Sequence, residues 1–135
     1  MDFVDGLPKS RRQHDRIWVI VDILTKFAYF LPVRSTNTVE ELAQKYVDKV
    51  VRLHGAPVSV VSDRGTEFTS HLWRAVQKCL GTKVQLSTTF HPQTDGQTER
   101  VNQVLEDMLR ACMLDFKGSW EDHIPLIEFA YNNNF

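Results

Sequence analysis

The fold of this chain is decided by residues 17–24, which read Ile-Trp-Val-Ile-Val-Asp-Ile-Leu. This run is too apolar for a strand with one solvent-exposed face, so it predicts a central strand of a sheet that is covered on both sides. Residues 27–33 predict its antiparallel neighbour after a short turn around Thr25 and Lys26. Upstream, residues 2–4 predict a further strand that ends at Gly6-Leu-Pro. The chain therefore begins with a predicted three-strand meander.

Beyond the meander the apolar period changes to three or four residues, which is typical of helices. The first stripe, residues 39–50, predicts a helix capped by Asn37 or Thr38, and further helices are predicted around residues 72–79, around residues 101–112 and after Ser119. Ser119 and Asp122 resemble a capping box. Short runs at 58–62 and 83–88 predict two more strands. This order predicts an α/β fold with one mixed five-stranded sheet and helices on both faces.

Composition narrows the class of protein. A chain of 135 residues, 42% hydrophobic and 24% charged, is expected to form one domain, 1–135, that is soluble and intracellular. The two cysteines, Cys79 and Cys112, form no C-x-x-C pair and the five histidines show no ligand spacing, which argues for buried thiols and against a zinc site. The net charge of −1 gives no overall signature of nucleic-acid binding, and the basic cluster at residues 9–12 is typical of a solvated loop.

Three acids stand at places where elements begin or end. Asp63 ends the apolar run 58–62, Glu99 opens the longest helical stripe with thirty-five residues between the two acids, and Asp2 begins the first predicted strand. Three adjacent carboxylates repel one another unless a divalent cation joins them, and their hard oxygen ligands favour Mg²⁺ or Mn²⁺, two ions in a phosphoryl-transfer site. Taken singly, the acids also fit a turn, a helix start and a terminal residue.

Four motifs carry a family resemblance. They are residues 1–8, residues 18–26, residues 61–70 (Val-Ser-Asp-Arg-Gly-Thr-Glu-Phe-Thr-Ser) and residues 90–100 (Phe-His-Pro-Gln-Thr-Asp-Gly-Gln-Thr-Glu-Arg). In this order they resemble the catalytic core of a retroviral-type integrase, specifically that of gypsy-type LTR retrotransposons, and the likeness covers essentially the whole chain. It implies an RNase H-like fold in which Asp2, Asp63 and Glu99 are the catalytic residues and the metal ligands.

The same resemblance implies an activity: trimming of element DNA 3′ ends, then joining of those ends to target DNA. The segment before the glutamate suggests DNA contacts by Phe90, His91, Gln93, Asp95 and Gln97, against the alternative of a loop with turn residues. Near the same helix start, Arg100 and Asn102 are further candidates for DNA binding, through contacts with phosphate, although Arg100 could equally pair with a surface acid. The implied context is one domain of a longer polyprotein, a homodimer or higher oligomer, made in the cytoplasm and acting in the nucleus.

Two other functions remain open at this point. One is a catalytically silent RNase H-like module used for DNA binding or self-association, and the other is a nuclease of RNA–DNA hybrids. Acids at all three positions favour the integrase, because a repurposed fold has no evident need for them. Asp5 and Asp22 lack the family position of a ligand, although Asp22 lies on a predicted strand.

Overall fold

The computed structural model describes residues 1–22, 25–52, 59–62, 66–80, 89–92, 96–115 and 119–133. For residues 59–62, 89–92 and 96–99 it describes the backbone and not the side chains. Three residues of the predicted site, Asp63, Gln93 and Asp95, and the predicted strand at 83–88 lie outside these ranges. The fold below is therefore that of the described residues.

The predicted meander is confirmed. β1 (Asp2–Val4), β2 (Arg16–Val21) and β3 (Ala28–Val33) form an antiparallel sheet with β2 in the centre. The β2–β3 turn is closed by two backbone hydrogen bonds, from Lys26 N to Asp22 O at 2.7 Å and from Asp22 N to Phe27 O at 2.9 Å. Lys26 adopts a φ of 63°, in the left-handed region that such tight turns require.

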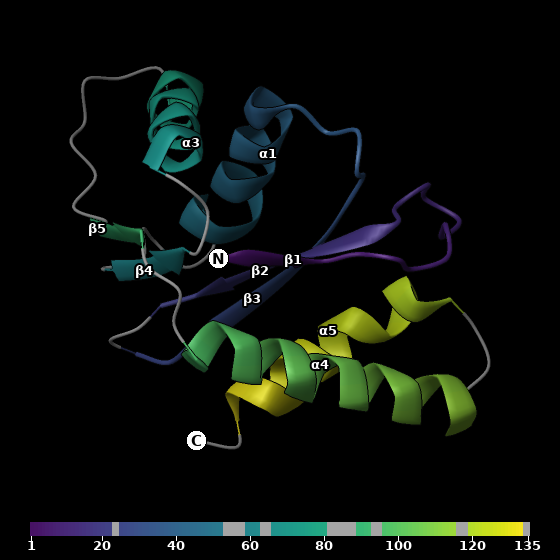
Figure 1. The fold of residues 1–135 in the computed structure, drawn as a ribbon. Coiled ribbons are helices and arrows are strands. Elements are labelled where there is room, and N and C mark those ends of the chain that lie inside the picture. The colour runs from purple at the N-terminus through teal and green to yellow at the C-terminus, as the bar shows by residue number, and fades with distance from the viewer. Residues whose placement is uncertain are drawn as a thin grey trace.

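Helices cover both faces of this sheet, as predicted. They are α1 (Val39–Tyr46), which continues into a π-helical turn (Val47–Val51), α3 (Thr66–Leu80), α4 (Gly96–Asp115) and α5 (Trp120–Asn132). Figure 1 shows α1 and α3 on one side of β1–β3 and α4 and α5 on the other. Within the described chain no helix is long and apolar enough to cross a membrane.

Strand alternation divides the core into two clusters. On the α1/α3 side lie Phe3, Trp18 and Tyr46, whose rings pack together with Phe3 stacked on Trp18 at 5.9 Å between centroids. On the α4/α5 side lie aliphatic residues of all three strands, including Val4 and Val19. Cys79 is a half-buried free thiol packed against the first cluster, and the Cys112 side chain lies outside the description.

The two predicted helix caps differ. Thr38 forms a full capping box with Glu41: Thr38 Oγ1 accepts from Glu41 N at 3.2 Å, and Glu41 Oε1 accepts from Thr38 N at 2.9 Å. Ser119 does stand at the N-cap of α5, but its side chain makes no cap hydrogen bond. Asp122 N donates instead to the Ser119 backbone oxygen at 3.1 Å, so the second capping box was predicted wrongly.

The prediction of one five-stranded sheet is also wrong for the described residues. β4 (Ser59–Ser62) pairs in parallel with β5 (Thr89–Pro92) in a separate two-stranded sheet, and no described ladder joins it to β1. Because β1 is three residues long and already pairs with β2, its other edge offers very few backbone groups to a further strand. The β4 backbone nonetheless lies against β2.

Candidate functional site

Asp2 lies on the sheet face that α4 and α5 cover. It stands opposite Val19 in the β1–β2 register, and it is two residues from Val4 on its own strand. Val4 and Val19 both pack in the α4/α5 cluster, and residues so related share one face. Asp2 is half-buried, and its Oδ1 accepts a hydrogen bond from Phe3 N at 2.8 Å. Its carboxylate is thus positioned by the strand toward the side where α4 lies.

Glu99 is the fourth residue of α4, three residues after the helix start at Gly96. Two residues later Val101 enters the core, where it and Leu105 share a cluster with Val4 and Val19. The beginning of α4 is therefore held against the sheet face that carries Asp2. The Glu99 side chain belongs to the part that the structure does not describe.

Asp63 directly follows Ser62, the last residue of β4, and lies outside the described residues. Figure 1 shows the β4–β5 pair and the first turn of α4 toward the end of the sheet where the chain begins. The structure thus brings Asp2 and the start of α4 to one face, and leaves the distances among the three predicted ligands undescribed. Among the described residues no group of three His, Cys, Asp or Glu could hold a metal ion.

The predicted DNA-contacting residues divide into three sets. Phe90 and His91 belong to β5, paired with Val60 and Val61, so they stand on a strand and not in a loop. Gln97 and Asn102 lie on α4 without described side chains, while Gln93 and Asp95 lie outside the described residues.

Arg100 is exposed on α4. Burial raises the pKa of Tyr131 on α5, and the positive charge of Arg100 opposes that rise, which places Arg100 near the contact of α4 with α5. No described acid forms an ion pair with Arg100.

Two other acids have structural roles. Asp22 is buried at the end of β2, where its backbone closes the β2–β3 turn. Its charge, second to burial, raises the pKa of Tyr29 on the neighbouring strand. Asp5 is exposed and accepts a hydrogen bond from Arg16 Nε. That neither acid belongs to the triad stays a prediction.

Sequence reasoning missed a buried carboxylate on the α5 side. Glu121 accepts hydrogen bonds from Ser10 Oγ and, at 2.8 Å, from His14 Nδ1, while Arg12 lies 3.7 Å away. Burial alone would raise the pKa of Glu121, but these hydrogen bonds and charges lower it. Next to it, Trp120 Nε1 donates to Pro8 O at 2.6 Å. No local pattern could have revealed this cluster, because its partners are more than 100 residues apart.

Comparison with known proteins identifies the family. The sequence profile of the integrase core domain matches residues 1–92, about two thirds of the chain. The chain belongs to the integrase core domain family. An RNase H-like α/β architecture follows from this membership and agrees with the sheet and its two helical layers.

Curated relatives of this integrase core are retrotransposon polyproteins. The Tf2-3, Tf2-4 and Tf2-5 transposon polyproteins of Schizosaccharomyces pombe are each 35% identical to it over 133 residues, which is 98% of this chain. The chain spans about a tenth of the length of each polyprotein. The likeness therefore covers one part of a much longer protein in each case.

Proposed function

We propose that this chain is the catalytic core of a retrotransposon integrase, a polynucleotidyl transferase that trims element DNA 3′ ends and joins them to target DNA. One observation of the fold carries the proposal: Asp2 lies on the sheet face against which the start of α4, the helix of Glu99, is packed. Family membership and the acids at positions 2, 63 and 99 support the same reaction class. The gypsy-type subclass and action in the nucleus belong to this proposal.

The donor set fits a hard divalent cation. Asp2, Asp63 and Glu99 would supply carboxylate oxygens only, which suit Mg²⁺ or Mn²⁺ better than softer metals. Such ions, when bound, stabilise the attacking and leaving oxygens of an in-line phosphoryl displacement. Of the three acids, Asp2 is the one with a described side chain: its carboxylate is half-buried and accepts a hydrogen bond from the Phe3 amide.

The remaining residues would position DNA. Phe90 and His91 belong to β5, which precedes the segment that leads to Glu99, and aromatic and imidazole rings are residue types that stack on unpaired bases. Gln93, Asp95, Gln97 and Asn102 would add hydrogen bonds to bases or backbone. Arg100, exposed beside the α4 start, is suited to a phosphate.

The test is metal-dependent strand transfer, or its reversal, on a branched DNA substrate. Glu99→Gln removes one carboxylate charge with little change in shape, and we expect activity to fall on the order of 100-fold. Glu106→Gln is the matched control, because Glu106 is exposed on the same helix two turns later. Equal activity of Glu99→Gln and Glu106→Gln would remove Glu99 from the triad. DNA binding without joining in every variant would favour a catalytically silent module.

A further inference from the structure

A second polar site lies away from the acids, between two loops. The loop pocket, as we call it, is a cavity of about 320 Å³ between the β1–β2 connection and the β3–α1 connection. It is lined by polar and charged residues alone: Lys9, Gln13, Asp15, Arg34, Ser35 and Thr36. A lining without apolar side chains does not suit an apolar ligand, so a charged or strongly polar group is the occupant to consider.

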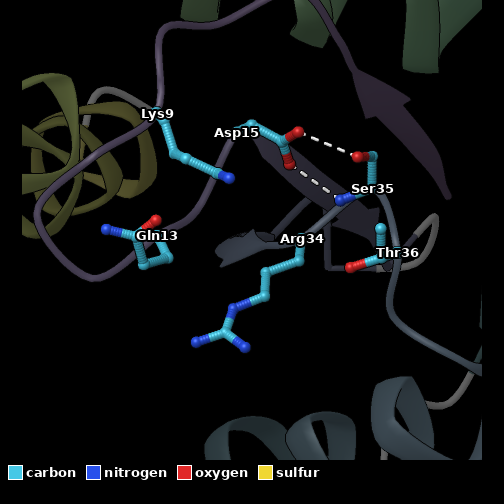
Figure 2. Close-up of a pocket in the computed structure, with 6 residues that line it drawn as sticks. All are labelled: Lys9, Gln13, Asp15, Arg34, Ser35 and Thr36. Atoms are coloured by element: carbon cyan, nitrogen blue, oxygen red, sulfur yellow. Dashed lines mark hydrogen bonds between the residues drawn. The ribbon is translucent and has the colours of Figure 1, made fainter.

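Hydrogen bonds hold the two walls of the loop pocket together. Asp15 accepts from Ser35 N at 2.7 Å and from Ser35 Oγ at 2.8 Å, and Asp15 N donates to Val33 O at 3.1 Å. Figure 2 shows these two bonds between Asp15 and Ser35, among the residues that line the pocket. The pocket therefore exists before any ligand binds, which lowers the entropic cost of binding.

Each loop is also fixed internally. In the first loop Ser10 N donates to His14 O at 2.8 Å and Gln13 N donates to Ser10 O at 2.9 Å. Gln13 lines the pocket with a φ of 68°, a left-handed conformation that is unfavourable for a non-glycine residue unless its surroundings hold it. In the second loop Arg34 N donates to Asn37 Oδ1 at 2.8 Å. The backbone that carries both cations is thus constrained.

The charges favour a monoanion. Asp15 stays ionised, because the hydrogen bonds from Ser35 lower its pKa, and both of its oxygens already accept from Ser35. Lys9 and Arg34 are exposed, and neither forms an ion pair with a described residue. Two cations and one anion give the lining a net charge of +1. Such a lining matches the single negative charge of one phosphodiester.

We propose that the loop pocket binds a backbone phosphate of DNA, with Lys9 and Arg34 as the cationic contacts and the Gln13 amide and Thr36 hydroxyl as donors. Arginine and lysine beside amide and hydroxyl donors are the usual partners of phosphate oxygens. The choice of DNA as the polymer rests on the proposed function. The proposed phosphate contact lies apart from the acids. Asp2 pairs with Val19 on β2, whereas the two loops leave the sheet beside Arg16. Arg16 is three residues from Val19, or roughly 10 Å along the strand.

The experiment compares two double variants of the whole chain by fluorescence anisotropy on a labelled DNA duplex. Lys9→Gln with Arg34→Gln removes two charges from the loop pocket, and Lys49→Gln with Arg52→Gln removes two charges from the exposed end of the π-helical turn. Salt is varied between about 50 and 200 mM. Circular dichroism confirms that both variants are folded.

We expect the loop-pocket variant to bind about 10-fold more weakly at low salt, and its slope of log K against log salt to fall in magnitude by about 1. The control variant should keep a slope near that of the unmodified chain. Equal losses in both variants would overturn the proposal, since only net charge would then matter. Saturable binding of inorganic phosphate at the pocket, with unchanged DNA affinity in the loop-pocket variant, would also overturn it.

The result is separable from the integrase proposal. If the loop-pocket variant binds and joins DNA as well as the control does, the loop-pocket proposal fails while the integrase function stands. If no variant joins DNA but the salt slope still depends on Lys9 and Arg34, the integrase proposal fails while the phosphate contact stands.

Discussion

The two faces of the three-stranded sheet are built differently. On the α1/α3 face the aromatic rings of Phe3, Trp18 and Tyr46 pack together in the core, with Phe3 stacked on Trp18 and Tyr46 tilted against it. The α4/α5 face also contains aromatic rings, those of Phe30, Trp120 and Tyr131, but polar contacts lie beside it. Glu121 accepts from Ser10 and His14 at one place, and at another the Asn132 amide bonds Ala28 N and O at 2.8 Å each. This second face also carries Asp2. The comparison suggests that one face supplies stability and the other positions a site.

The largest effect should come from the aromatic face. Trp18 is fully buried, and Trp18→Ala would leave a cavity between Phe3 and Tyr46. We expect a loss of about 4 kcal/mol in the free energy of unfolding, measured by urea denaturation. Phe30→Ala is the matched change on the α4/α5 face, where Phe30 packs edge-on against Tyr131. A greater loss for Phe30→Ala than for Trp18→Ala would contradict the division of roles.

The second effect concerns the hydrogen bonds that join Glu121, on α5, to Ser10 and His14. Glu121→Gln removes a buried charge that accepts from Ser10 and His14, and we expect a loss of about 2 to 3 kcal/mol at pH 7. Because the folded pKa of Glu121 is lowered, its stabilisation is present above the unfolded pKa of about 4.3 and is lost as pH falls through the folded value. The difference from the unmodified chain should therefore shrink in acid.

The measurement is urea denaturation of both proteins from pH 7 down to pH 3. Asp122→Asn, at the neighbouring exposed position, is the control and should change stability little at any pH. A constant deficit of Glu121→Gln over the whole range would show that the ionised carboxylate is not what stabilises the contact.

A third effect has the opposite sign. Burial raises the pKa of Glu128, on α5, to about 7. Below about pH 4 this carboxyl is protonated in both states, and as pH rises toward 7 the unfolded chain ionises first, so folding is penalised. We expect Glu128→Gln to stabilise the protein by about 2 kcal/mol at pH 8 and not at pH 4. Urea denaturation at both pH values measures this, and equal effects at both would contradict it.

These residues also show how far the sequence predicts the structure. Residues 17–24 and 27–33 are apolar runs and residues 39–50 carry a helical apolar period, so the central strand, its neighbour and the helix after Thr38 could be predicted from neighbouring residues alone. The pairing of β4 with β5, and not with β1, depends on contacts between distant segments that no local pattern encodes.

In the candidate site, too, local features could be predicted from the sequence and contacts between distant segments could not. The chemistry of Asp2 and Glu99 was readable from their motifs, and the face that Asp2 shares with Val4 follows from strand alternation. The contact of Ser10 and His14 with Glu121 was not readable, since it joins segments more than 100 residues apart. Lys9 and Arg34 likewise come from distant segments, and they line one pocket where the Asp15–Ser35 hydrogen bonds join their loops.

The smallest effect sharpens the contrast between the two helix starts. Thr38→Ala removes one half of the capping box of α1, leaving Glu41 N without its side-chain acceptor, and we expect a loss of about 1 kcal/mol. Ser119→Ala, at the N-cap of α5, should cost less, because the Ser119 hydroxyl makes no cap hydrogen bond and Trp120 already anchors that helix to Pro8. Urea denaturation of the two variants side by side measures the difference. A larger loss for Ser119→Ala than for Thr38→Ala would contradict this expectation. It would mean that the start of α5 is stabilised by its own cap and not by the contacts of Glu121 and Trp120 with the β1–β2 loop.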